Sequence, residues 1–255
     1  MARYFIEVGY EGTSFCGFQI QDGQETVQSV VTAAFQMALK ETCALTGSSR
    51  TDAGVHAKQN FFHFDTDIVL TPKHIYSINS ILPPTVVVNG IYAVAPEAHA
   101  RFDALARTYT YTITTKKDPF LIDKAWHFPF PVSLETLQAM ALELPNHQDF
   151  ESFSKKNAGN KTNICTIHLS SWQEVSASSF TYTVSANRFL RGMVRGLVGT
   201  MLRIARQSES SEAAVKAFRA VIAAKDPSLC DFSTPAKGLV LEQVAYPVNA
   251  FSQSI

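Results

Sequence analysis

The sequence predicts an α+β protein made of two similar halves, each a mixed sheet with helices on one face in the ferredoxin-like manner. Segments that alternate like strands and segments with a helical apolar stripe follow one another as strand, helix, strand, helix, strand, and the second half repeats this order. The length of 255 residues also exceeds the usual size of one domain. We therefore expect an N-terminal half at 1–104, a C-terminal half at 105–255 and a central cleft between them, which is a favoured place for a ligand.

The first half begins with a strand at 3–10, in which Tyr4, Ile6 and Val8 face one way. Glycines then mark a loop, and a helix is expected at 26–41 because its apolar residues recur at helical spacing: Val27, Val30, Val31, Ala34, Phe35, Ala38 and Leu39. Further strands are expected at 43–45, 59–64 and 86–94. Thr71 followed by proline favours the start of a short helix at 72–82.

The second half opens with a strand at 108–114, where tyrosines and an isoleucine alternate with threonines. Helices are expected at 133–144, 188–206 and 211–224, and strands at 164–172, 179–186 and 239–246. Apart from its arginines and glycines, the helix at 188–206 is largely apolar, which indicates that it is largely buried. Its three glycines, Gly192, Gly196 and Gly199, allow close approach of another backbone or of a ligand.

The composition narrows the class of protein. Apolar residues make up 46% of the chain, enough for a sizeable core, and no run approaches the roughly 20 apolar residues of a membrane span, so we expect a cytoplasmic protein. The histidines and the four cysteines do not occur at metal-ligand spacing, and the phosphate-binding, dinucleotide-binding and serine-hydrolase motifs are absent from the sequence. We expect free thiols, and a metal site, a dinucleotide cofactor and serine hydrolysis all lack support.

The net charge is zero, but the basic residues are unevenly distributed. Between residues 152 and 208 the only acid is Glu174, whereas the basic residues are Lys155, Lys156, Lys161, Arg188, Arg191, Arg195, Arg203 and Arg206. Such an excess is typical of a protein that binds a polyanion. A solvated surface whose charges are balanced by acids from elsewhere remains an equal alternative.

The segment Arg50-Thr51-Asp52-Ala53-Gly54-Val55-His56 carries the most unusual combination of side chains. A carboxylate, a guanidinium and an imidazole lie together between two expected strands. Because Asp and Gly are common turn formers, an ordinary structural loop is one interpretation. The other is a catalytic loop in which Asp52 carries the chemistry.

Two further candidates lie in the second half. Arg191 and Arg195 are four residues apart and would share one helix face. An arginine in so apolar a helix needs an anionic partner, and Asp52 is the partner we expect for Arg195. Tyr109 is either a core aromatic beside Tyr111 or a platform on which a base stacks.

Together these segments resemble one family, the TruA-type tRNA pseudouridine synthases. The matching segments occur in the family's order along nearly the whole chain: Gly9–Gly12 with Gly17–Gln19, Thr26–Gln28, Arg50–His56, His99–Phe102 with Arg107–Tyr111, Asn187–Phe189 with Met193–Arg195 and Gly199, and Lys237–Leu239. The resemblance implies that uridine is converted to pseudouridine at positions 38, 39 and 40 in the tRNA anticodon stem-loop. It implies no metal, no cofactor and a homodimer.

By this resemblance Asp52 is the essential aspartate, Tyr109 the base-stacking tyrosine and Arg195 the arginine that pairs with the aspartate. Leu239 would pack beside the target base. The remaining residues expected to contact the substrate are Arg50, Thr51, His56, Gln59, Arg101, Arg107, Arg188 and Arg191. Two positions depart from the family's pattern, since Phe18 stands where tryptophan is usual and Ser49 where glycine is common.

Three other functions share part of this pattern. An inactive RNA-binding protein of the same fold would be expected to lack Asp52, Arg195 or Tyr109, and all three are present. A hydrolase that uses Asp52 with His56 would need an oxyanion or metal site, which the sequence does not show. A synthase that acts on other RNA positions shares every feature named above.

Overall fold

The structure, a computed structural model, describes residues 1–155 and 159–254 and divides into two compact units. The first unit comprises Met1–Leu105 with Val240–Ile255, and the second comprises Ala106–Leu239. Both units combine helices with strands, and parallel as well as antiparallel pairs occur, so the α+β class is confirmed. The sequence assigned 240–255 to the C-terminal half, whereas the structure groups these residues with the first unit.

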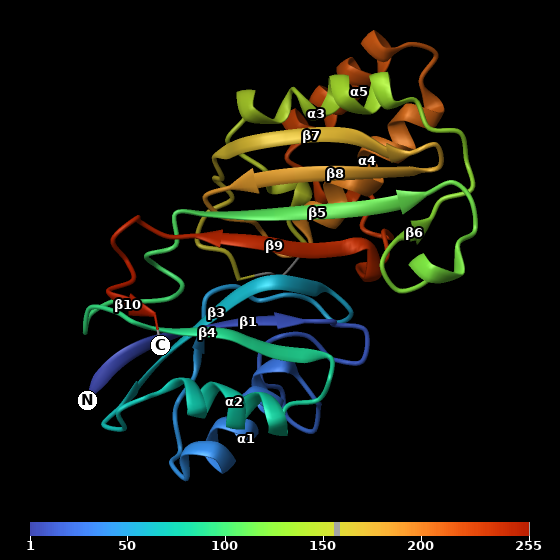
Figure 1. Ribbon diagram of the computed structural model, residues 1–255. Helices are drawn as coiled ribbons and strands as arrows, with labels where there is room; N and C mark the ends of the chain where they lie inside the picture. Colours follow the sequence, from blue (N-terminus) through green and yellow to red (C-terminus); the bar gives the residue numbers. More distant parts are fainter. Residues whose placement is uncertain (156–158, 255) are drawn as a thin grey trace. The chain divides into compact units, whose positions relative to one another are not determined.

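The first unit is a mixed sheet with two helices (Figure 1). Its strands run in the order β10-β4-β1-β3-β9, β2 pairs with β3, and β3 and β9 are parallel while the other pairs are antiparallel. The elements are β1 (Ala2–Tyr10), α1 (Val27–Leu39), β2 (Thr46–Gly47), β3 (His56–Thr66), α2 (Pro72–Ile81), β4 (Val86–Ala93), β9 (Leu239–Ala245) and β10 (Gln253–Ser254).

Local signals in the sequence explain where α1 begins and how it packs. The Thr26 hydroxyl accepts a hydrogen bond from Ser29 N at 3.2 Å, and the Ser29 hydroxyl in turn accepts from Thr26 N at 2.9 Å. This reciprocal cap satisfies amides that the first turn leaves without partners. The apolar stripe of α1 faces the sheet. There the Phe35 and Phe64 rings pack edge to face, with their centroids 5.5 Å apart.

An aromatic cluster covers the other face of β1 and β3. Phe5 and Phe61 point to this face. The centroid of the Tyr246 ring lies 5.3 Å from that of Phe5 and 5.2 Å from that of Phe61. Phe251 stacks on Phe61 at 5.9 Å. Burial of these rings is favourable, and it holds the chain after β9 against the first unit.

The second unit contains the strand order β5-β8-β7, antiparallel throughout, with β6 parallel to β5 (Figure 1). Helices pack against it. The elements are β5 (Ala106–Thr114), β6 (Trp126–His127), α3 (Leu134–Ala141), β7 (Ile167–Ser176), β8 (Ser179–Ala186), α4 (Met193–Gln207) and α5 (Ser211–Ala224), with short 3₁₀ turns at Pro119–Leu121, Leu144–Asn146, Glu151–Phe153, Pro227–Leu229 and Ala236–Gly238.

Two of the expected elements are corrected by the structure. Residues 43–45 are irregular, and the strand predicted there lies at Thr46–Gly47. The helix predicted from residue 188 begins at Met193, because Gly192 adopts a left-handed conformation with φ of 77°. Arg191 therefore precedes the helix and does not share a helix face with Arg195. Within the described ranges, no helix is both long and apolar enough to cross a membrane.

Candidate active site

Asp52 begins a tight turn between β2 and β3. The amide of Val55 donates a hydrogen bond to the Asp52 carbonyl at 3.2 Å, and Gly54 has a φ of 77°, which glycine adopts without strain. The Asp52 side chain is half-buried, whereas Thr51 and Val55 are buried. Part of the segment is thus a turn, as its Asp and Gly indicate, and this turn holds the carboxylate at the edge of the core.

A buried polar network holds the residues that precede Asp52. The Tyr10 and Thr51 hydroxyls lie 2.9 Å apart, and the Asn60 side-chain amide donates to Tyr10 Oη at 3.2 Å and to the Ser49 carbonyl at 2.9 Å. Asn60 Oδ1 accepts from the Ser48 hydroxyl at 2.8 Å. Tyr10, Ser48 and Asn60 were not predicted from the sequence. The available signal was a polar residue, Asn60, directly before two phenylalanines in a strand.

Two glycines of the opening motif lie against the same loop. A Cβ atom at Gly12 would lie 2.0 Å from the Val55 carbonyl oxygen, and one at Gly17 would lie 3.1 Å from the Thr51 carbonyl oxygen. Gly17 also has a φ of 93°. Because a side chain at either position would push the turn away, these glycines explain physically why the motif accompanies the aspartate segment.

His56 is buried at the start of β3 beside Glu11 and Gly12. Its Nδ1 lies 3.0 Å from the Gly12 amide and 3.2 Å from Glu11 Oε1. A neutral imidazole accepts the hydrogen bond from the amide, and a protonated one would donate to the carboxylate instead. In either state Nδ1 is engaged with the first loop of the chain.

Phe18, at the position where the resemblance implies tryptophan, is buried in the first unit. Its ring stacks on Phe62 at 4.6 Å with planes 15° apart, and a Cβ atom at Gly47 would lie 2.3 Å from the ring. An apolar ring packed between Gly47 and Phe62 fills the space beneath the loop. The substitution therefore keeps the packing function of an aromatic residue.

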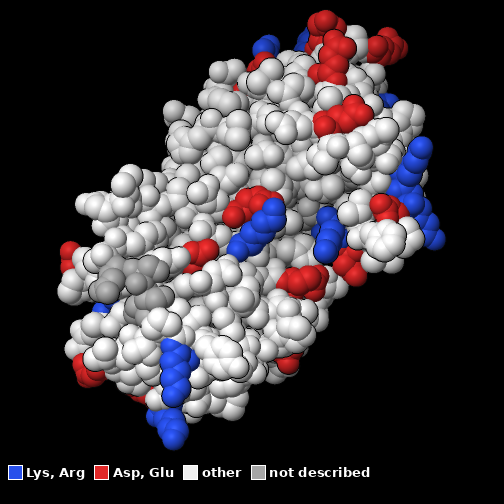
Figure 2. Space-filling model, in the orientation of Figure 1, with Lys and Arg blue, Asp and Glu red and all other residues white. Residues whose placement is uncertain are grey.

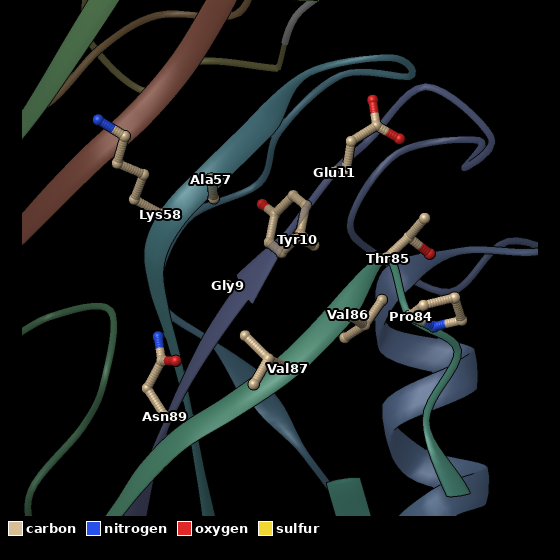
Figure 3. A pocket seen from close by; sticks show the side chains of 10 residues that line it. All are labelled: Gly9, Tyr10, Glu11, Ala57, Lys58, Pro84, Thr85, Val86, Val87 and Asn89. Carbon is tan, nitrogen blue, oxygen red and sulfur yellow. The ribbon is translucent and has the colours of Figure 1, made fainter. Parts of the chain in front are cut away.

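A hollow of about 350 Å³ lies on the first unit where β1 ends (Figure 3). Its lining includes Tyr10 and Ala57, which place it beside the loop, and it is completed by Gly9, Glu11, Lys58, Pro84, Thr85, Val86, Val87 and Asn89. The Lys58 ammonium is 2.8 Å from Glu242 Oε2, so its charge is compensated. The hollow is consequently not a strongly cationic site.

The remaining predicted site residues of the first unit, Arg50, Gln59 and Arg101, lie in three different environments. Arg50 is exposed. Gln59 accepts a hydrogen bond from the Val244 amide at 3.1 Å and so joins β3 to β9. Arg101 is also exposed, and its guanidinium lies 5.7 Å from the centre of the Phe102 ring.

Tyr109 and Leu239 lie at opposite ends of the second unit's sequence. Tyr109 is on β5, and its ring packs edge to face with Phe189 with the two centroids 5.1 Å apart. The residue is 8% exposed. Tyr111 is fully buried on the same strand, and its hydroxyl donates to the Pro235 carbonyl at 2.8 Å. Leu239 is buried where β9 begins.

Arg195 lies in the first turn of α4 and is half-buried. Its Nε donates to the Thr234 carbonyl at 2.7 Å. A Cβ atom at Gly199 would lie 2.4 Å from Thr234 Oγ1, and one at Gly196 would lie 2.6 Å from Cys230 Sγ. The expected close approach at these two glycines is confirmed, and it is made by the segment 230–234.

Basic side chains gather around the loop between β8 and α4. Arg188 and Arg191 belong to this loop, and Arg107 donates to its Asn187 carbonyl at 3.0 Å. The Lys155 side chain lies against Gly192, where a Cβ atom would be 3.0 Å from its Cε. We call Arg107, Lys155, Arg188 and Arg191 the basic loop cluster.

Among the described residues of the basic stretch 152–208, the basic side chains lie in different environments. Arg203 donates to the Leu229 carbonyl at 2.7 Å, and the Arg206 guanidinium lies 3.5 Å from the centre of the Phe130 ring. Lys156 lies outside the described residues. On the face drawn in Figure 2, acidic and basic side chains are scattered among uncharged residues. The charge excess in the sequence is thus divided between a partly exposed cluster and arginines that bind the protein itself.

All four cysteines are free thiols, as the sequence predicts. Burial raises the pKa of Cys230 to about 12 and that of Cys165 to about 11. Over residues 1–155 and 159–254, no group of three or more His, Cys, Asp or Glu side chains is arranged to hold a metal ion.

Comparison with known proteins identifies first the class of enzyme and then the family to which the chain belongs. Residues 141–247 match the family model described as tRNA pseudouridine synthase. The chain is 40% identical to tRNA pseudouridine synthase A of Parabacteroides distasonis over 98% of both chains. It is 39% identical to that of Bacteroides thetaiotaomicron, over 99% of this chain and 94% of the relative, and 30% identical to that of Staphylococcus aureus, over 97% and 93%. The chain belongs to the tRNA pseudouridine synthase A family, isomerases that act on uridine in tRNA.

Proposed function

We propose that this protein converts uridine to pseudouridine at positions 38, 39 and 40 of the tRNA anticodon stem-loop, with Asp52 as the catalytic carboxylate. The observation that carries the proposal is the turn at residues 52–55 in a chain of this family. It holds a half-buried carboxylate at the edge of the core, next to residues 48–51, which a buried hydrogen-bond network fixes. A fixed and partly desolvated carboxylate is suited to covalent or acid–base catalysis.

The reaction breaks the N1–C1′ bond of uridine, turns the base and forms a C5–C1′ bond, after which C5 loses its proton and N1, released from C1′, gains one. No atom is gained or lost, so neither a redox partner nor an energy source is required. Asp52 can add to the base or the sugar, or it can remove a proton from the ribose. The target nucleotide must first leave its stack, at a cost of roughly a few kcal/mol.

We assign the other proposed roles to residues of the second unit. Tyr109 stacks on the target base, Arg195 is the catalytic arginine and Leu239 packs beside the base. The basic loop cluster supports binding of the RNA backbone, because its partly exposed cationic groups can neutralise phosphates. Arg50, His56, Gln59 and Arg101 complete the substrate-binding set. The protein acts as a homodimer in the cytoplasm, with one tRNA contacting both subunits.

Replacement of the carboxylate tests this proposal. Asp52→Asn and Asp52→Ala should abolish pseudouridine formation, while tRNA affinity and thermal unfolding stay close to those of the wild type because the side chain is only half-buried. Asp67→Asn is the control, since that carboxylate pairs with the chain's amino terminus at 2.8 Å. Pseudouridines would be mapped in tRNA after incubation with each variant. Full activity of the Asp52 variants would refute the assignment, and modification of other positions would refute the choice of substrate site.

A further inference from the structure

We propose that Tyr10 and Asn60 are positioning residues for the reaction, which fix the Asp52 carboxylate through the backbone of residues 48–51. The inference rests on the proposed catalytic role of Asp52. It also assigns Thr51 to this positioning network in place of the RNA contact suggested by its motif.

Asn60 is fully buried in β3, and both ends of its side chain are used. Its Nδ2 group donates to the Ser49 carbonyl and to Tyr10 Oη, while Oδ1 accepts from the Ser48 hydroxyl and from the Phe61 amide at 2.9 Å. Only an amide side chain offers two donors and an acceptor of this size. Because an unsatisfied buried amide is costly, the loop is held in the one position that completes these bonds.

Tyr10 extends the network to the residue next to Asp52. Its hydroxyl lies between the Asn60 amide at 3.2 Å and the Thr51 hydroxyl at 2.9 Å. The Thr51 carbonyl also accepts from the Phe18 amide at 3.1 Å. Thr51 is thus held by its side chain and by its carbonyl, and the Thr51–Asp52 peptide has little freedom to rotate.

The position of this network explains why it affects the reaction more than the fold. Tyr10 is the last residue of β1, and the pairing of β1 with β3 is irregular between Val8 and Tyr10. The regular part of the strand pair does not need the Tyr10 hydroxyl. The loop at 48–51 is, however, anchored by it, and a displacement of about 1 Å of a catalytic group can cost about 100-fold in rate.

The test removes single hydroxyl groups. Tyr10→Phe and Thr51→Val should each lower the single-turnover rate of pseudouridine formation by about 10- to 100-fold, with the Kd for tRNA within about two-fold of the wild type. The double variant should be no slower than the slower single variant, because both substitutions break the same hydrogen bond. Asn60→Asp, which loses both amide donors, should be at least as slow as Tyr10→Phe.

The matched control is Tyr182→Phe in the second unit. Tyr182 is also buried, and its hydroxyl lies 2.9 Å from the Ser170 hydroxyl, but Tyr182 is on β8 in the other unit from Asp52. Its replacement should leave the rate within about two-fold of the wild type, while thermal unfolding changes as it does for Tyr10→Phe.

The outcomes separate this inference from the proposed function. A Tyr10→Phe rate equal to that of Tyr182→Phe, whether both are normal or both are slow, would overturn the positioning role. So would a weakened Kd with an unchanged rate. Retained activity in Asp52→Asn would instead refute the catalytic assignment itself.

Discussion

Gly12 leaves no room for a side chain, because a Cβ atom there would lie 2.0 Å from the carbonyl oxygen of Val55 at the end of the aspartate turn. Gly12→Ala should therefore displace the turn. We expect the free energy of unfolding to fall by about 1–3 kcal/mol, as for overpacked core sites, and pseudouridine formation to be largely abolished. Urea unfolding and a single-turnover assay would measure the two effects.

Gly23→Ala provides the comparison for Gly12. Gly23 has a φ of 70°, and a Cβ atom there would meet no atom within 4 Å. The substitution should cost about 1–2 kcal/mol through backbone strain alone and leave the activity of the folded protein intact. An equal fall in activity in the two alanine variants would show that the close approach at Gly12 has no special influence on the turn.

At the scale of elements, the loop between β8 and α4 carries the expected RNA contacts. Arg188→Ala and Arg191→Ala should weaken tRNA binding and lower the slope of log K against log salt by about 0.9 for each phosphate that is no longer neutralised. Arg206→Ala should leave the slope unchanged, because that guanidinium lies on the Phe130 ring. Binding titrations between low and moderate salt would decide. Identical slopes for all variants would mean that the basic loop cluster does not bind RNA.

His63 links β3 to the segment that carries Arg101. Its Nδ1 accepts from the Ala100 amide at 3.2 Å, and burial, followed by the positive charges of His99 and Arg3, lowers the pKa of His63 from 6.5 to about 4. Between these values the unfolded chain binds a proton that the folded chain does not. The free energy of unfolding should therefore fall as the pH drops from about 6.5 to about 4.

His63→Asn tests this pH dependence, since the asparagine oxygen can still accept the bond from Ala100. The variant should be less stable at neutral pH but should lose less stability than the wild type as the pH drops from 6.5 to about 4. Urea midpoints across this range would measure the difference. Parallel curves for the two proteins would show that His63 does not titrate in this way.

At the scale of the whole molecule, the proposed homodimer is the main prediction. Light scattering on the purified protein should give twice the mass of the chain, independent of added tRNA. A monomer at concentrations well above those of the activity assay would contradict the proposal. Stoichiometry measured with tRNA would then test whether one tRNA contacts both subunits.

Much of the molecule is predictable from periodicity. The helices at Val27–Leu39 and Ser211–Ala224 and the strands at Ala2–Tyr10 and Ser179–Ala186 agree closely with the expected segments, because their apolar residues repeat with the period of the element. The expected start of α4, at residue 188, was wrong, since the apolar stripe continues through a loop that only the left-handed Gly192 interrupts. A glycine's φ is not visible in sequence.

The amino-acid sequence by itself determined the α+β class, the family and the candidate carboxylate, because each depends on local pattern or on ordered motifs along the chain. Only the tertiary structure decided that Tyr10, Ser48 and Asn60 support the aspartate loop and that Arg206 stacks on an aromatic ring. It also decided that 240–255 rejoin the first unit. The physical reason is that buried hydrogen bonds and ring contacts join residues far apart in the chain, and their formation depends on which partners folding brings together.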